Sequence, residues 1–232
     1  MIPGTMSSRI SIIIPAFNEE SSIGLVLDAL PQDKIHEIIV VNNNSTDDTA
    51  RVATEHGARV VEEPRKGYGS ACLKGIGELN TPDIVVFLDG DFSDFPEEIV
   101  DLVNPIEKGS VDFVLGSRMI LPESRMALLP QARYGNWLAV FLIKLFFNFS
   151  FTDLGPFRAI RYNSLMAIGM QDIDFGWTVE MQIKAVKNGL RIQEVPVKYR
   201  ERIGVSKITG TVSGTFKAGT KIIYTIFKYL LT

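Results

Sequence analysis

The chain has 232 residues, of which 46% are hydrophobic and 22% are charged, and its formal net charge at pH 7 is −3. These values are typical of a globular protein with a sizeable core, and they exclude a disordered or collagen-like chain. The single cysteine, Cys72, excludes an intrachain disulfide and fits a reducing compartment. The two histidines, His36 and His56, have no partner at the spacing of zinc ligands, so we expect no zinc site.

The first half of the chain alternates short apolar runs with amphipathic segments. We expect strands at residues 9–14, 37–41, 58–62, 84–88 and 112–116. The expected helices end near residues 30, 56, 79 and 108, and polar caps or proline precede most of them. Strands that alternate with helices at this spacing indicate right-handed βαβ units. The fold class is therefore α/β, with a mostly parallel sheet and helices on both faces.

The second half of the chain is less regular. Residues 119–132 contain proline and predict a loop long enough to be a mobile lid. Residues 137–151 are almost wholly apolar but too short to span a bilayer, which needs about 20 residues. They form either a buried helix or one at a membrane interface. Further elements are expected as a strand at 157–161, a helix at 177–187 and a strand at 191–196.

The C-terminal segment differs from the rest in charge. From residue 198 onward the net charge is +6, so the preceding residues carry −9. A basic segment on an acidic body indicates phosphates or an anionic membrane surface, although a solvated helix face gives the same pattern. Residues 213–231 predict an amphipathic helix that either anchors at an interface or docks on the domain's own core. We expect no nucleic-acid partner.

Two carboxylates follow the most apolar strand of the chain, in the sequence Asp89-Gly90-Asp91. Ligands of open α/β sheets bind at the carboxyl ends of the strands, so a site is expected here. Two adjacent carboxylates suit Mg²⁺ or Mn²⁺, which bind through carboxylates and substrate phosphates. We expect Gly90 to permit a sharp turn. An acidic turn that merely caps the helix near Pro96 is the alternative.

Several short motifs occur in one order along the chain, and together they carry a family resemblance. Residues 13–20, 40–47, 65–69 and 88–91 resemble the nucleotide-sugar half of glycosyltransferase family 2, which has the GT-A fold. Residues 116–118, 133–136, 152–159 and 194–207 are similar to the branch of dolichyl-phosphate mannose and glucose synthases. The resemblance implies one GT-A domain over residues 1–210, with a donor half at 1–118 and an acceptor half at 119–210. Residues 211–232 would form the C-terminal helix.

The resemblance implies a donor site for a nucleotide-diphosphate sugar. Asp89 and Asp91 would hold the divalent ion, which would stabilise the leaving diphosphate. Glu19 and Asn43 would flank the base and ribose, and Phe17 would supply an apolar wall. The remaining implied donor residues are Pro15, Lys66, Gly67, Gly90, Arg202 and Lys207.

The resemblance also implies an acceptor site. Arg118 and Arg133 would grip the phosphate of a polyprenyl acceptor, because guanidinium groups bind phosphate bidentately. A lipid phosphate is already anionic, so it needs orientation rather than a general base. Each arginine is otherwise a surface ion pair. The residues Asp153, Arg158, Trp177 and Glu180 would shape the sugar pocket, or the charged ones would form a buried ion pair.

We therefore expect the protein to be an inverting, metal-dependent glycosyltransferase that moves a hexose to a polyprenyl or dolichyl phosphate. It would be cytoplasmic and peripheral at the inner membrane face, held by its own helices or by a membrane partner protein. One alternative keeps the fold but uses a soluble or saccharide hydroxyl as acceptor, with Asp153 or Asp174 as general base. Another is a nucleotide-sugar-binding subunit without turnover. A dehydrogenase is disfavoured, because residues 67–72 lack the third glycine of the dinucleotide fingerprint.

Two departures from the family's pattern affect the expected substrates. Aspartate pairs are usual in the family where this chain has Asn42-Asn43, and asparagine both donates and accepts. The choice between UDP-glucose and GDP-mannose therefore stays open. Mannose synthases often carry glutamine where this chain has Ser93, which weakens assignment to that enzyme.

Overall fold

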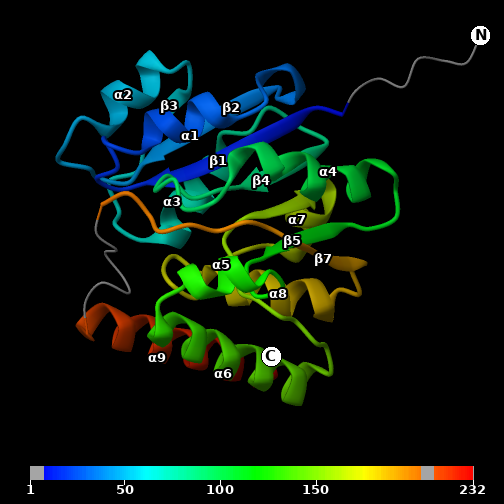
Figure 1. Ribbon diagram of the computed structural model, residues 1–232. Helices are drawn as coiled ribbons and strands as arrows, with labels where there is room; N and C mark the ends of the chain where they lie inside the picture. Colours follow the sequence, from blue (N-terminus) through cyan, green and yellow to red (C-terminus); the bar gives the residue numbers. More distant parts are fainter. Residues whose placement is uncertain (1–7, 205–211, 232) are drawn as a thin grey trace, which may run out of the picture.

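A computed structural model describes residues 8–204 and 212–231 (Figure 1). The first half contains β1 (Ile10–Ala16), α1 (Ile23–Ala29), η1 (Gln32–Lys34), β2 (Glu37–Asn42), α2 (Thr49–Glu55), β3 (Arg59–Glu62), α3 (Tyr68–Gly77) and β4 (Ile84–Phe87). The remainder contains η2 (Pro96–Glu98), α4 (Ile99–Glu107), β5 (Phe113–Ser117), α5 (Pro122–Ala127), α6 (Pro130–Phe147), β6 (Arg158–Arg161), α7 (Tyr162–Ile168), α8 (Trp177–Lys187), β7 (Ile192–Pro196) and α9 (Val212–Leu231).

The seven strands form one mostly parallel sheet in the order β3-β2-β1-β4-β6-β5-β7. The exception is β6, which runs antiparallel to both of its neighbours, β4 and β5. Because β6 is antiparallel to both β4 and β5, those two strands point in the same direction. The segments that follow β1, β2, β4 and β5 therefore meet at one edge of the sheet, where ligands of α/β proteins bind.

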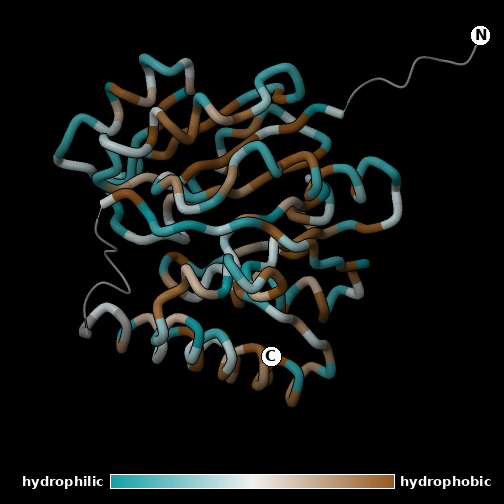
Figure 2. The backbone as a smooth tube through the Cα atoms, in the orientation of Figure 1, coloured by the Kyte–Doolittle hydropathy of each residue, from teal (hydrophilic) through white to brown (hydrophobic). Residues whose placement is uncertain are grey.

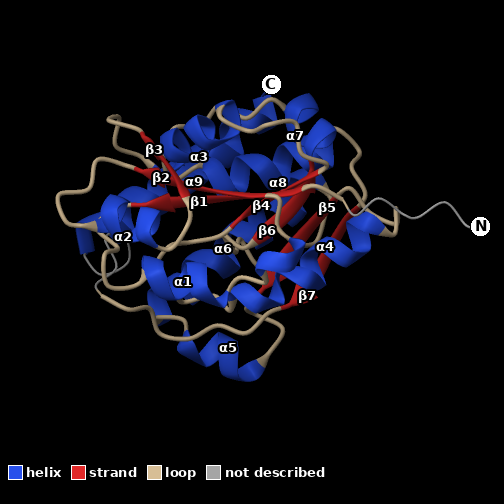
Figure 3. Ribbon diagram, turned by 90° about the horizontal axis from the view of Figure 1, so that it is seen from above, coloured by secondary structure: helices blue, strands red, loops and turns tan. Residues whose placement is uncertain are grey.

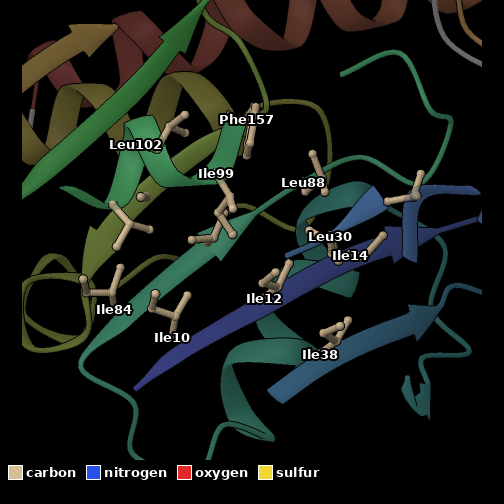
Figure 4. Close-up of a cluster of buried hydrophobic side chains, with 14 of the residues drawn as sticks. Ile10, Ile12, Ile14, Leu30, Ile38, Ile84, Leu88, Ile99, Leu102 and Phe157 are labelled. Atoms are coloured by element: carbon tan, nitrogen blue, oxygen red, sulfur yellow. The ribbon is translucent and has the colours of Figure 1, made fainter. Parts of the chain in front are cut away.

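Helices cover both faces of the sheet (Figure 3), and one apolar cluster on each face holds the layers together. The first joins the β1, β2 and β4 side chains to α1 and α4, and Figure 4 shows Ile12, Ile14 and Leu102 within it. The second joins the other face of the same strands to α3, α6, α8 and α9. Strands buried on both faces need near-continuous apolar sequence, and β4 (Ile-Val-Val-Phe) has it.

The expectation of a loop at residues 119–132 is wrong. This segment holds α5 and the first turn of α6, which begin at Pro122 and Pro130. Proline at the first helical position lacks only an N–H that would be unpaired there anyway. The prolines therefore mark helix starts rather than a loop. The short helix α7, directly after β6, was not expected either.

The apolar segment expected at 137–151 is the main part of α6, which ends where Asn148 adopts φ 54°. Its inner face is buried through Ala139 and Ile143, and α9 packs beside it (Figure 1). The outer faces of both helices carry exposed apolar side chains (Figure 2). Within the described residues, none of the helices has the length and apolar character needed to cross a bilayer.

Candidate active site

Two carboxylates lie where β4 ends. Asp91 is buried, and Asp89 is partly exposed to a cavity. Burial raises the pKa of Asp89 to about 7, the Asp91 carboxylate adds to the rise, and a hydrogen bond from Tyr68 (3.1 Å) opposes it. Gly90 lies in the turn that follows β4, as expected, but its φ is not positive and a Cβ there would make only ordinary contacts, so this turn does not require glycine. Phe92, just after the turn, has φ 60°.

Arg202 joins the carboxylates of two loops. Its guanidinium lies 2.8 Å from Glu19 after β1 and 3.1 Å from Asp91 after β4. The other Asp91 oxygen accepts hydrogen bonds from the Ser93 amide (2.9 Å) and hydroxyl (2.5 Å). Asp91 is therefore already paired and oriented, whereas among the described residues the Tyr68 hydroxyl is the hydrogen-bond donor to Asp89.

The segment after β7 crosses the loop that carries Asp91. The Ile203 amide donates to the Asp91 carbonyl (3.1 Å), and the Arg200 amide donates to the Ser93 carbonyl (2.9 Å). The Arg200 guanidinium lies 3.7 Å from the ring centroid of Phe92 and 4.0 Å from that of Phe95. These contacts fix the segment, and with it Arg202, against the carboxylates.

Arg118, at the end of β5, forms a two-pronged ion pair with Asp153. Its Nε and Nη2 donate to the two carboxylate oxygens at 2.8 and 2.9 Å, and Asp153 is fully buried. Burial alone would lower the pKa of Arg118, but Asp153 outweighs it and the pKa lies above its ordinary value. The fork expected to hold phosphate is thus engaged by Asp153, and among the described residues Nη1 is the guanidinium nitrogen without a hydrogen-bond acceptor.

Asn43 organises a loop. Its amide nitrogen donates to the carbonyls of Glu63 (3.0 Å) and Arg65 (2.7 Å), and its oxygen accepts from the Gly67 amide (2.9 Å). The loop places the Lys66 ammonium 5.0 Å from the centroid of the Phe17 ring. The roles of Asn43, Lys66 and Phe17 toward a nucleotide stay predictions.

Arg158 and Glu180 are fully buried and do not pair with each other. The Arg158 guanidinium donates to backbone carbonyls, among them Thr178 (3.0 Å). Glu180 accepts from the amides of the 171–172 loop, from Lys184 (2.8 Å) and from the Tyr229 hydroxyl (2.5 Å). Trp177 is buried edge-on against Phe87. These contacts support the second half of the fold.

Three further residues of the expected set lie apart from these contacts. Pro15 is in β1, two residues before Phe17. Arg133 is half-buried in the first turns of α6, and among the described residues no carboxylate lies within ion-pair distance of it. Lys207 lies outside the described residues. The site roles of all three stay predictions.

One cavity of about 290 Å³ brings the two halves of the chain together. Asp89, Asp91, Arg118 and Arg202 line one part of it. The rest is largely apolar and lies between the start of α6 and the start of α9, with Ile222 as the largest aliphatic side chain from α9. Charged groups for phosphate and an apolar wall thus share a single cavity.

Sequence reasoning missed three residues of this region. Tyr68 donates to Asp89, and Tyr199 lies under Arg118 with 5.0 Å from the guanidinium to the ring centroid. Asp94 is buried, and neither of its carboxylate oxygens has a hydrogen-bond partner in the described part of the chain. Burial, and next Asp89, raise its pKa well above the ordinary value. The sequence signal that could have identified Asp94 was the presence of an acidic residue three positions after Asp91.

The carboxylates at the end of β4 fit a divalent cation. They are hard oxygen ligands, and their mutual repulsion in a buried setting is what a cation would relieve. Across residues 8–204 and 212–231, no group of three or more His, Cys, Asp or Glu is arranged to hold a metal. An ion here would therefore complete its ligand shell with phosphate and water, as Mg²⁺ commonly does.

Comparison with known proteins identifies the family. Residues 11–167 match the model described as glycosyl transferase family 2. The chain belongs to glycosyltransferase family 2. It is 36% identical to an uncharacterized glycosyltransferase of Mycobacterium tuberculosis over 90% of this chain and 94% of that protein. It is 31% identical to an undecaprenyl-phosphate mannosyltransferase of Micrococcus luteus over 89% of this chain and 90% of that protein.

Solved structures confirm the GT-A-like fold of this glycosyltransferase. The glucosyl-3-phosphoglycerate synthase of M. tuberculosis, in complex with Mn²⁺, UDP and phosphoglyceric acid, superposes with a TM-score of 0.79. The match covers 96% of this chain and 78% of that one at 23% identity. A second structure of the same enzyme contains Mg²⁺ and UDP and has a TM-score of 0.76. The α/β class expected from the sequence is thus confirmed.

Proposed function

We propose that this family 2 enzyme transfers a hexose, glucose or mannose, from a nucleotide-diphosphate sugar to a polyprenyl phosphate, with inversion at the anomeric carbon. The observation that carries the proposal is the single cavity in which Asp89 and Asp91 face Arg118 beside an apolar wall. A donor diphosphate, an anionic acceptor and a hydrocarbon chain each find a matching surface there.

On the donor side, Asp89 and Asp91 hold Mg²⁺ or Mn²⁺, which when bound offsets the charge that develops on the leaving diphosphate. Arg202 adds a positive charge beside Asp91, 3.1 Å away. Glu19 and the Asn43-organised loop lie at the neighbouring strand ends and bound the space for the nucleoside. Mn²⁺ and UDP in the solved synthase support this assignment.

On the acceptor side, Arg118 orients the phosphate through the guanidinium nitrogen that Asp153 leaves available. Asp153 holds the guanidinium plane fixed with two hydrogen bonds, so little side-chain entropy is lost when phosphate binds. A phosphate monoester is ionised at neutral pH and attacks the anomeric carbon directly. The cavity then needs no carboxylate as general base, and direct displacement inverts the anomeric centre.

Attachment at the cytoplasmic face of a membrane completes the proposal. Along α6, the side chains of Tyr134, Trp137, Phe141 and Leu145 are each about half exposed or more and share one face. Trp137 stacks on Phe141, with ring centroids 5.9 Å apart. Tyrosine and tryptophan favour the interface between water and lipid. Lys217 on α9 is exposed and adds positive charge for anionic lipids, whereas Lys221 pairs with Asp172 (2.9 Å).

The test compares acceptors. Purified enzyme is supplied with UDP-glucose or GDP-mannose, Mn²⁺ and either undecaprenyl phosphate or 3-phosphoglycerate, and released nucleotide diphosphate is measured. We expect release to require undecaprenyl phosphate. The variant Arg118→Lys should lower this turnover at least about tenfold, since a lysine ammonium cannot keep both hydrogen bonds to Asp153 and also present a fixed donor to the phosphate, while nucleotide affinity stays within about twofold. If no nucleotide diphosphate is released with either acceptor, the proposal is contradicted.

A second candidate is transfer to a small soluble phosphorylated acceptor. It is favoured by the structural likeness to a synthase solved with phosphoglyceric acid. Selective release with 3-phosphoglycerate in the same assay would support it instead. The apolar wall of the cavity and the similarity to an undecaprenyl-phosphate mannosyltransferase support the lipid acceptor.

A further inference from the structure

The two parts of the cavity are lined by side chains of different chemistry. Its charged part ends at Arg118, at the carboxyl end of β5. Its other part is lined by Ala132 and Gly135 of α6 and by Ala218 and Gly219 of α9. All four residues are small, and they lie on two helices that pack together further along, where the ring centroids of Phe146 and Phe227 are 5.3 Å apart.

The space beside the two glycines is open. Among the described residues, no atom would lie within 4 Å of a Cβ built at Gly135 or Gly219, and both glycines line the cavity. Other glycines near the site are different, because a Cβ at Gly155 would lie 2.6 Å from the Gly116 carbonyl oxygen. Gly135 and Gly219 therefore border free volume rather than neighbouring backbone.

This part of the cavity suits hydrocarbon. Asn136 lines it, but its amide nitrogen donates to the Thr152 carbonyl (3.0 Å) and its oxygen accepts from the Leu154 amide (2.8 Å). Leu154, Phe175 and Ile222 supply apolar lining. Gln131 and Thr178 add polar atoms to the lining, but these three apolar side chains would leave the hydroxyls of a sugar unpaired, which is unfavourable.

We propose that the start of α6 and residues 218–222 of α9 form a track for the first isoprene units of the acceptor, and that Gly135 and Gly219 keep it open. The inference rests on the proposed function and specifies how that site takes a lipid. A cavity of about 290 Å³ cannot enclose a long polyprenyl chain as well as the reacting groups. The remainder of the chain leaves past Tyr134 and Phe216, which are exposed apolar side chains next to this lining.

The experiment places a larger side chain in the track, from α6 in one variant and from α9 in the other. Gly135→Leu and Gly219→Leu are compared with Gly77→Leu, a matched control on α3, where a Cβ also meets nothing within 4 Å. Leucine favours helix over glycine, so none of the three changes opposes its helix. Each protein is assayed with undecaprenyl phosphate and with dimethylallyl phosphate, which has a single isoprene unit, and its affinity for UDP with Mn²⁺ is measured by calorimetry.

We expect the ratio of kcat/KM for undecaprenyl phosphate to that for dimethylallyl phosphate to fall at least about tenfold in both track variants, as steric exclusion from an apolar pocket usually gives. It should not change in Gly77→Leu, and UDP affinity should not change in any variant. An unchanged ratio, or an equal loss with both acceptors, overturns the track while leaving the proposed function intact. If the unaltered enzyme uses neither phosphate, the proposed function itself fails and the track fails with it.

Discussion

At the scale of single residues, the end of β4 holds two carboxylates with unequal partners. Asp91 has Arg202 and Ser93, whereas Asp89 has the Tyr68 hydroxyl and a raised pKa. Ionisation of the Asp89 carboxyl therefore costs free energy in the folded protein. A bound divalent ion would remove that cost, which couples folding stability to metal.

The variant Asp89→Asn tests this free-energy cost, because the cost should change the stability of the protein with pH. A carboxyl whose pKa is raised from 3.8 to about 7 on folding lowers stability progressively as pH rises between these values. Without metal, Asp89→Asn should therefore be more stable than the unaltered protein at pH 8, by about 2 kcal/mol, because each pKa unit is worth about 1.4 kcal/mol and cavity water screens part of it. Urea unfolding at pH 8 and pH 4 measures this. The gain should vanish near pH 4; an equal gain at both values would show that the charge of Asp89 is not responsible.

At the scale of elements, glycines let a loop of the second half contact a helix of the first. Gly67 has φ 143°, and a Cβ there would lie 2.2 Å from the Ile173 carbonyl oxygen. The Ser70 amide donates to the same oxygen at 2.9 Å. This close approach fixes the start of α3, and hence Tyr68, beneath Asp89.

The variant Gly69→Ala should break this contact. Its Cβ would lie 2.0 Å from the Asp172 carbonyl oxygen, which is backbone and cannot rotate away. We expect a loss of at least about 2 kcal/mol in the free energy of unfolding, the range for overpacked sites. Gly77→Ala, on the same helix but with open space around it, should be neutral or stabilising by up to about 1 kcal/mol. Similar losses in both variants would mean that helix position, not the 172–173 contact, sets the effect.

The sequence predicted some elements well and others poorly, for identifiable reasons. β4 and α8 were predicted because a buried apolar run and a helical period are local signals. α5 was missed because proline at a first helical turn looks the same as proline in a loop. The place of β6 between β4 and β5 depends on pairing between distant strands, which no local pattern encodes.

The candidate site shows the same division. The carboxylates of Asp89 and Asp91 were evident from their position after a strand. The engagement of Arg118 by Asp153, 35 residues later, and of Arg202 by Glu19, 183 residues earlier, were not. Such ion pairs arise only when the folded chain brings the strand ends together.

At the scale of the whole molecule, the lower layer in Figure 1, α6 and α9, combines the open end of the cavity with an apolar outer surface. The exposed side chains of Tyr134, Trp137, Phe141 and Leu145 lie on α6, the helix that also lines the apolar part of the cavity. A lipid acceptor held in a bilayer would thus enter from the side that we propose contacts the membrane.

Vesicle binding tests this arrangement. The double variant Trp137→Ser and Phe141→Ser should sediment with vesicles containing about 30% phosphatidylglycerol at least about fivefold more weakly than the unaltered protein, because it loses interfacial aromatic area. Leu25→Ser, an exposed apolar side chain on α1 in the donor half, is the matched control and should bind normally. Equal binding of all three proteins would rule out this face of α6 as the membrane contact.

The claim on which the rest depends is that Asp89 and Asp91 bind a donor diphosphate through a divalent ion, and titration calorimetry of UDP and GDP with and without Mn²⁺ tests it most directly. We expect one of the two nucleotides to bind the unaltered protein only when Mn²⁺ is present. With Asp91→Asn, which keeps the size of the side chain and the oxygen that accepts from Ser93, affinity should fall at least about tenfold. Binding that is independent of Mn²⁺, or equally tight in Asp91→Asn, would contradict the account.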